Sequence, residues 1–286
     1  MNVDAQQGKP VHSLSGAAIK SIVLNNYTYS TTNKSKGMLV YKSKLVYNRN
    51  SSVIEEVSCK LFSGQFLVDS NIYKYSKEEK LSERENYERN ELKLKTVYKY
   101  NEQLKPIEIL YYYEGKPGGK ETLTYDKVGT NTGRVQYEKD GRMEFFCEYI
   151  YNAEGQMTEE IKYRKDSSLW VRKTYSYDEH QNKIKEASDN TYYKSTNLTL
   201  WEFDAKGNQT NCKQFFDGKL ATETHEGYDK NGDLITYSYL ASPETIPLKK
   251  TLGGYKYNDK GDWVKRIQFN AKGDPVAIEE RIIEYY

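Results

Sequence analysis

The chain has 286 residues, and its 43 basic and 41 acidic residues leave a formal net charge of +2. This balance gives no electrostatic reason for binding nucleic acid or an anionic membrane. No apolar run approaches the ~20 residues of a membrane-spanning helix. We therefore expect neither a nucleic-acid partner nor a membrane span.

Tyrosine is the main aromatic residue, with 28 Tyr against 8 Phe and 3 Trp. A tyrosine can bury its ring while its hydroxyl stays in contact with water. Because aliphatic residues are scarce, these rings must offset much of the backbone entropy that is lost on folding. The composition predicts a thin sheet with a half-hydrated aromatic face rather than a thick, dry core.

The N-terminal segment, residues 1–16, is polar, contains Gly8 and Pro10 and shows no periodicity, so we expect a loose tail. The next stretch, residues 17–29, is apolar and is compatible with a short helix or a strand. Its β-branched residues and the Tyr27-Thr28-Tyr29 sequence favour the strand.

A repeat then occupies the rest of the chain, with a spacing of about 25 residues over its central part. Each copy is anchored by an aromatic residue that is followed by a small polar residue. The anchors are Tyr47, Tyr75, Tyr100, Tyr125, Tyr151, Tyr177, Phe203, Tyr228 and Tyr257. A fixed spacing of this length is typical of stacked supersecondary units.

Each unit has the sequence chemistry of a β-hairpin. Asn or Asp follows the anchor and Gly often comes three positions later, as in Asn152 with Gly155 and Asp204 with Gly207. Asn and Asp accept bonds from their own following backbone, and Gly supplies the positive φ that ends a tight turn. The pattern therefore predicts two antiparallel strands in each unit.

Strand alternation predicts two chemically different faces. Paired aromatics such as Tyr149 and Tyr151 should share one face and form an aromatic ladder from unit to unit. In the following strand, Met157, Ile161 and Tyr163 should share a face, as should Trp263, Ile267 and Phe269 in the last unit. The alternate positions Thr158, Glu160 and Lys162 should form a solvated face.

These features predict an all-β fold, an antiparallel β-hairpin meander in which residues 17–286 form a single repeat domain. Nine anchors imply roughly eighteen strands, and open sheets seldom exceed about ten strands without curling because neighbouring strands twist. We expect the sheet to coil into a spiral or a partly closed sheet with its tyrosine face inward. An extended single-layer sheet is the alternative.

The repeats resemble the YD repeats of the Rhs family, most clearly at Tyr177-Asp178, Tyr228-Asp229 with Gly232, and Tyr257-Asn258 with Gly261. The resemblance covers most of the chain from about Tyr47. It implies hairpin units in one continuous sheet, and the Tyr- and Lys-rich version looks like the small exported YD-repeat proteins of Bacteroidetes-type bacteria. The chain departs from large Rhs proteins in having no room for a toxin, and the family offers no catalytic residues to carry over.

The sequence shows no catalytic, cofactor-binding or metal-binding motif, so we expect no enzyme activity, no cofactor and no metal. The three cysteines, Cys59, Cys147 and Cys212, lack metal-type spacing and are expected to be free thiols. The segment Asp229-Lys230-Asn231-Gly232-Asp233 superficially resembles a calcium loop but lacks the later glutamate, so we interpret it as a turn.

The leading functional hypothesis is a non-enzymatic, exported β-repeat protein that acts as a binding or scaffold module at the bacterial cell envelope. Its ligand is unknown, and a glycan or an envelope protein is the expected partner class. The protein would be periplasmic or on the cell surface after removal of a signal peptide, although residues 1–16 show none; a cytoplasmic location is the alternative.

Two other functions remain open from the sequence. Exposed aromatic side chains could bind carbohydrate or peptidoglycan, with Trp170, Trp201 and Trp263 as candidate ligand-binding residues. A hydrolase site could also be assembled across units from His225 with the nearby Glu223 or Glu226, although no nucleophile motif accompanies them.

Overall fold

The computed structural model describes residues 17–241 and 248–286, so the predicted tail lies outside the described residues. The structure is built from twenty strands and is all-β, as predicted. The strands are β1 (Ile19–Ser30), β2 (Ser35–Tyr47), β3 (Val53–Phe62), β4 (Gln65–Tyr75), β5 (Leu81–Glu88), β6 (Glu91–Tyr100), β7 (Pro106–Tyr113), β8 (Lys116–Tyr125), β9 (Asn131–Tyr137), β10 (Met143–Tyr151), β11 (Met157–Arg164), β12 (Leu169–Tyr177), β13 (Lys183–Asn190), β14 (Ser195–Phe203), β15 (Gln209–Phe216), β16 (Lys219–Tyr228), β17 (Leu234–Leu240), β18 (Leu248–Tyr257), β19 (Trp263–Phe269) and β20 (Pro275–Tyr285).

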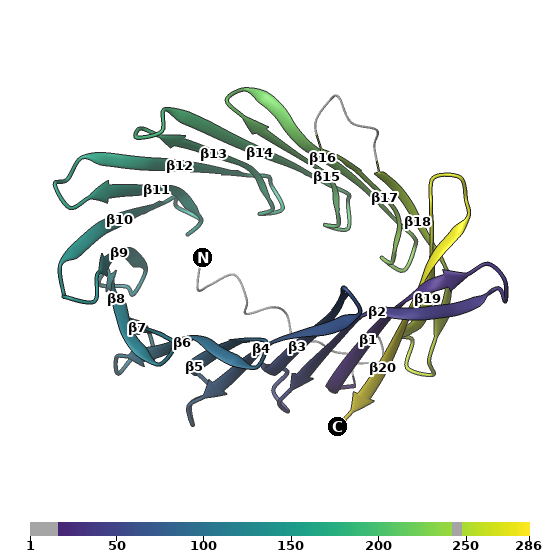
Figure 1. The fold of residues 1–286 in the computed structure, drawn as a ribbon. Helices are drawn as coiled ribbons and strands as arrows, with labels where there is room; N and C mark the ends of the chain where they lie inside the picture. Colours follow the sequence, from purple (N-terminus) through teal and green to yellow (C-terminus); the bar gives the residue numbers. More distant parts are fainter. Residues whose placement is uncertain (1–16, 242–247) are drawn as a thin grey trace. The chain divides into compact units, whose positions relative to one another are not determined.

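The strands form an antiparallel meander in which strands adjacent in sequence lie side by side (Figure 1). The ladder from β10 to β11 pairs Phe146 with Tyr163, and the ladder from β11 to β12 pairs Ile161 with Arg172. The first predicted element is a strand, as the β-branched residues indicated. None of the described residues forms a helix that is long and apolar enough to cross a membrane.

The sheet is closed, which corrects the expected spiral or partly closed sheet and also its extended single-layer alternative. All twenty strands belong to one sheet, and β1 pairs antiparallel with β20 from Ile19–Tyr285 to Thr28–Ala277. β1 also pairs with β2, and β20 with β19, so neither terminal strand is left as a free edge. A sheet whose first and last strands pair is a β-barrel, and closure removes the edges on which another chain could add.

The chain divides into two compact units. Of the described residues, unit 1 comprises 17–98, 111–117 and 252–286, and unit 2 comprises 99–110, 118–241 and 248–251. The pairing of β1 with β20 lies within unit 1. The side-chain cluster described below lies within unit 2.

The anchor turns have the predicted chemistry. The Asp178 carboxylate accepts bonds from the backbone N–H groups of His180 and Asn182, at 2.9 and 2.8 Å. Asp229 does the same for Asn231 and Asp233, so the calcium-like segment is a turn. The residue that ends the turn has positive φ, and it is Gly in copies such as Gly155 (φ 80°).

A β-bulge beside the anchor aromatic shifts the ladder by one residue and corrects the predicted face assignments. Tyr151 pairs with Met157, whereas Ile150 pairs with Glu159. The same slip occurs at Tyr47, Tyr75, Tyr125, Tyr177, Phe203 and Tyr228. Because a one-residue slip moves all later side chains to the opposite face, Met157 lies with Tyr151, while Ile161 and Tyr163 lie on the other face.

The bulge also overturns the prediction that Glu160 and Lys162 are on a solvated face. They pair with Tyr149 and Cys147, so they lie on the face that carries the paired tyrosines, which we call the aromatic face. The same correction applies to Trp263. Its ring is contacted by Arg266 and Arg281, which lie on the face opposite Ile267.

The opposite face, which we call the charged face, carries exposed ion-pair ladders. Glu108 binds Lys99 at 2.6 Å and Lys120 at 2.8 Å, and Arg172 binds Glu159 at 2.7 Å. Exposed pairs of this kind contribute little stability individually, but they keep the surface hydrated. The prediction of a solvated Lys- and Glu-rich face is therefore correct for these residues.

The tyrosines of the aromatic face are joined mainly through their hydroxyls. Tyr75 donates to the carbonyl of Val53 at 2.8 Å, Tyr125 to that of Pro106 at 2.7 Å and Tyr177 to that of Met157 at 2.8 Å. Each acceptor is the first residue of the strand that follows the preceding anchor turn. In the predicted aromatic ladder, each of these tyrosines therefore partly buries its ring and donates a hydrogen bond from its hydroxyl to a backbone carbonyl.

Replacing Leu104 with Gly is expected to stabilise the protein by about 1 kcal/mol. Leu104 ends an anchor turn with φ 58°, a conformation that costs a residue with a Cβ roughly 1–2 kcal/mol. Gly207 ends the equivalent turn with φ 82°, so Gly207→Ala should destabilise by a similar amount. Urea unfolding of both variants checks the pair, and a loss of stability in Leu104→Gly would contradict the reasoning.

Candidate functional site

The structure places the three predicted tryptophans in half-buried positions where cationic side chains already cover their rings. The Lys162 ammonium lies 4.0 Å from the ring centroid of Trp170, and that of Lys183 lies 4.8 Å from Trp201. The guanidinium carbons of Arg266 and Arg281 both lie 4.5 Å from Trp263. Trp263 belongs to unit 1 and the other two to unit 2, and no described contact joins them.

Of the groups considered for a hydrolase site, the structure brings together His225 and Glu223 but not Glu226. His225 Nε2 lies 3.1 Å from Glu223, which also pairs with Lys213 on the charged face. Glu226 lies on the aromatic face, where it accepts a 2.5 Å bond from the Tyr228 hydroxyl. Adjacent strand positions point to opposite faces, so His225 and Glu226 cannot act on one substrate bond from these positions.

The cysteines are free thiols, as expected. Cys147 is buried on the aromatic face, and burial raises the pKa of its thiol. A thiol with a raised pKa is a poor nucleophile at neutral pH. Among the residues that the structure describes, no group of three or more His, Cys, Asp and Glu side chains is arranged to hold a metal ion.

The most developed cluster lies on the aromatic face of unit 2 and centres on Arg134 of β9. Its guanidinium contacts Glu121 on β8 at 3.1 and 3.3 Å and Glu160 on β11 at 3.7 Å. Only 20%, 10% and 13% of the side-chain surfaces of Arg134, Glu121 and Glu160, respectively, are exposed to solvent. Burial opposes the charge of Arg134, but Glu121 and the neighbouring groups outweigh it and raise the arginine pKa.

A second part of the cluster places a lysine between two aromatic rings. The Lys162 ammonium lies 3.5 Å from the ring centroid of Phe145 and 4.0 Å from that of Trp170. The two rings meet edge to face with centroids 6.1 Å apart. Burial lowers the pKa of Lys162. A cation held over ring faces gains about 0.5–2 kcal/mol depending on its hydration.

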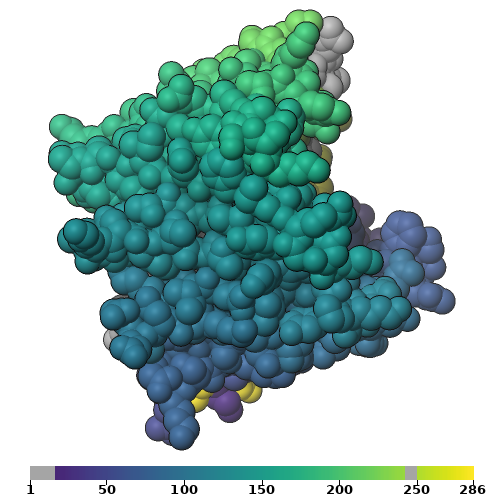
Figure 2. Space-filling view, turned by 90° about the vertical axis from the view of Figure 1, so that its left-hand side faces the viewer, coloured from purple at the N-terminus to yellow at the C-terminus, as the bar shows by residue number. Residues whose placement is uncertain are grey.

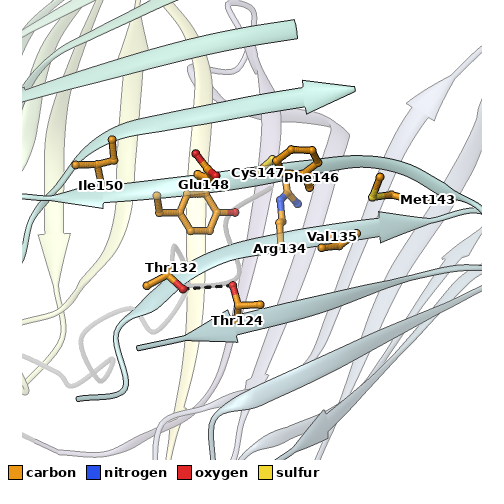
Figure 3. A pocket seen from close by; sticks show the side chains of 10 residues that line it. Thr124, Thr132, Arg134, Val135, Met143, Phe146, Cys147, Glu148 and Ile150 are labelled. Atoms are coloured by element: carbon orange, nitrogen blue, oxygen red, sulfur yellow. Dashed lines mark hydrogen bonds between the residues drawn. The ribbon is translucent and has the colours of Figure 1, made fainter. Parts of the chain in front are cut away.

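A pocket of about 590 Å³ adjoins this cluster between β9 and β10. The ladder between these strands runs from the Met143–Tyr137 pair to the Glu148–Gly133 pair, and Thr132 and Ile150 line the pocket beyond its end. Figure 3 shows Arg134 extending from β9 toward Cys147 on β10, with Thr124 and Thr132 joined by a hydrogen bond of 3.3 Å. The pocket therefore combines hydroxyl, thiol and guanidinium groups with the apolar Ile150 and Met143.

Sequence reasoning missed this cluster because the bulge was not foreseen. With strict alternation from Met157, both Glu160 and Lys162 fall on the solvated face. The first residue of the strand after an anchor turn, such as Lys183 or Gln209, pairs with the anchor in either register and therefore does not reveal the slip.

Tyrosines of the aromatic face are expected to ionise well above their usual range. Burial and the Glu226 carboxylate raise the pKa of Tyr228 to about 12, and burial also raises the pKa of Tyr149 and Tyr175. Because the folded pKa exceeds the unfolded value of about 10, these groups stabilise the fold fully below that pH and progressively less above it. Phenolate absorbance during alkaline titration should rise in two stages, the second with unfolding. A single stage near the ordinary value would contradict this.

Comparisons with known proteins found no matching family model and no matching curated protein. Solved structures do match. The TcdB2–TccC3–Cdc42 structure shares 11% identity over 88% of this chain and 17% of its own, with a TM-score of 0.40. The Tc holotoxin pore of Photorhabdus luminescens shares 14% sequence identity over 93% of this chain and 14% of its own chain, with a TM-score of 0.44. A porin-like protein from Bacteroides uniformis shares 9% sequence identity over 93% of this chain and 98% of its own chain, with a TM-score of 0.36.

This chain thus spans less than a fifth of the two toxin chains that it matches. At these identities and TM-scores, the similarity carries no inference about activity, ligand or partner.

Proposed function

We propose that this protein is a non-enzymatic β-repeat protein of the bacterial cell envelope that serves as a binding or scaffold module. The observation that carries the proposal is that acids of the aromatic face are engaged in the same way in both units. Glu160 in unit 2 pairs with Arg134 at 3.7 Å, and Glu279 in unit 1 pairs with Arg266. Carboxylates bound in this way hold strands together and are poorly placed to exchange protons with a substrate.

The envelope location rests on the resemblance of the units to exported YD repeats. A small, exported protein with a closed sheet has no strand edge that would aggregate outside the cell. Its free thiols are half-buried or buried. We regard periplasm or cell surface as the working location.

Glycan binding by a platform made of the three tryptophans is less favoured. Each ring is contacted by a Lys or Arg side chain of the protein itself, which competes with a sugar for the ring face. A glycan would need a different surface of the molecule.

Sedimentation of the purified full chain with isolated bacterial envelope fragments tests the proposal. The protein should pellet with the fragments and should be released from them at high salt or by a competing envelope component. No soluble product should appear. Turnover of an envelope polymer that is lost on a single substitution would overturn the proposal, as would a failure to bind envelope material. A screen of common ester, glycoside and peptide substrates provides the activity arm.

A further inference from the structure

Within the described residues, three side chains of unit 2 lack either a hydrogen-bond partner or an ion-pair partner. The indole Nε1 of Trp170 is buried and has no hydrogen-bond partner. In the described part of the chain, Lys162 and Arg164 have aromatic contacts but no ion pair with a carboxylate. The Trp170 nitrogen is too deeply buried for a ligand to reach, whereas Lys162 and Arg164 carry positive charge that no ion pair among the described residues neutralises.

The two cations lie beside an exposed pair of tyrosines. The guanidinium carbon of Arg164 lies 5.7 Å from the Trp170 ring centroid and 4.7 Å from that of Tyr192. Tyr192 and Tyr193 lie at the tip of the hairpin between β13 and β14, with centroids 4.9 Å apart and planes at 81°. They are 63% and 70% exposed. In Figure 2 the teal and green segments of unit 2 face the viewer, and groups of side chains project at their sides.

This tip differs in composition from other hairpin tips of the repeat. The turns between β7 and β8 and between β15 and β16 are made by Glu114-Gly115 and Asp217-Gly218, which are small and polar. Two adjacent aromatic residues at a turn are not required by hairpin geometry. Exposed aromatics of this kind mark binding surfaces more often than isolated apolar residues do.

The tip is also held in place, so little order would have to be created on binding. The Thr191 amide donates to the carbonyl of Trp170 at 3.0 Å, and its hydroxyl donates to that of Leu169 at 2.6 Å. The Asn190 side chain accepts bonds from the amides of Tyr192 and Tyr193, both at 3.1 Å. Preorganisation of this kind lowers the entropic cost of binding.

We propose that this surface binds an acidic saccharide, with its carboxylate or phosphate on Lys162 and Arg164 and a sugar ring on Tyr193, the more exposed of the two tyrosines. Two cations without a carboxylate partner among the described residues match an oxyanion. The face of an aromatic ring carries partial negative charge, which attracts the polarised C–H groups on the flat side of a sugar. This inference rests on the proposed envelope function and names the ligand class for it.

Calorimetric titration of the full chain tests the proposal with three probes: an oligomer of glucuronic acid, a glucose oligomer of equal length, and a glucose oligomer carrying a terminal phosphate. At least one acidic oligomer should bind, and the neutral oligomer should bind at least about tenfold more weakly, as expected for the loss of a charge-assisted bond. The two acidic probes distinguish a carboxylate from a phosphate ligand. Equal binding of acidic and neutral oligomers, or no binding of either acid, would overturn the proposal.

Arg164→Gln should reduce the affinity for the acidic oligomer by about tenfold or more, and Tyr193→Ser should reduce it without abolishing it. Arg172→Gln is the matched control, because Arg172 lies on the charged face of the neighbouring strand and should not change binding. Unchanged affinity in both test variants would refute the site, as would inorganic phosphate binding as tightly as the acidic oligomer. Envelope sedimentation separates the two proposals: if the variants still pellet while no acidic saccharide binds, only this inference fails.

Discussion

The double variant Val23→Cys and Ile282→Cys is expected to form a disulfide on mild oxidation and to raise the free energy of unfolding by about 5 kcal/mol. Val23 on β1 and Ile282 on β20 are direct cross-strand partners. Directly opposed residues of an antiparallel pair have Cα atoms about 4.5–5.5 Å apart, which a disulfide can span. The effect is large because the bond closes a loop that contains most of the chain.

The native cysteines should first be replaced in a background variant, so that any new bond is unambiguous. Peptide mapping identifies the bond, and urea unfolding with and without reductant measures the stability. The matched control is Val23→Cys with Ile278→Cys, since Ile278 pairs with Tyr27 and not with Val23. If the control pair cross-links as readily as the test pair, or if neither does, the closure of the sheet between β1 and β20 is wrong.

Replacing Arg134 with Met is expected to destabilise the protein by about 3–5 kcal/mol. Removing one member of a buried ion pair leaves the other charge uncompensated, and here Glu121 and Glu160 both depend on the same guanidinium. Glu121 is itself a buried residue, with 8% of its surface exposed. The loss should appear in chemical unfolding at neutral pH.

Arg172→Met provides the comparison on the charged face. Arg172 binds Glu159 at 2.7 Å, but its side chain is 52% exposed, so its removal should cost at most about 1 kcal/mol. Adding Glu121→Gln to Arg134→Met should restore part of the stability, because one stranded charge is removed. A cost for Arg134→Met no greater than that for Arg172→Met would show that the cluster is not a buried ion-pair network.

The hairpin units were predictable because their chemistry is local. A turn that begins at Asp178 needs only the amides of residues two and four positions later, and the structure has those bonds at 2.9 and 2.8 Å. The strand at Ile19–Ser30 was predicted from its own β-branched residues. Such interactions depend on neighbours in sequence and therefore leave a readable pattern.

The candidate site was much less predictable. Trp170 was singled out as an exposed sugar platform, but its ring lies under Lys162 and its indole nitrogen is buried. Tyr192 and Tyr193 break the polar pattern of the turns, yet they were not singled out. The three-dimensional link between them is Arg164, whose contacts with Trp170 and Tyr192 cross between hairpins.

The sequence by itself determined the repeating hairpin, the Asx turn after each anchor aromatic and the two-sided chemistry of the strands, because these depend on local hydrogen bonding and period-two alternation. Only the tertiary structure decided which charged residues lie on the aromatic face, because a bulge at Tyr151 shifts the register by one residue. It also decided that the sheet closes, since the pairing of β1 with β20 joins segments from opposite ends of the chain. That pairing depends on the accumulated twist of all the intervening strands and not on any residue near either end.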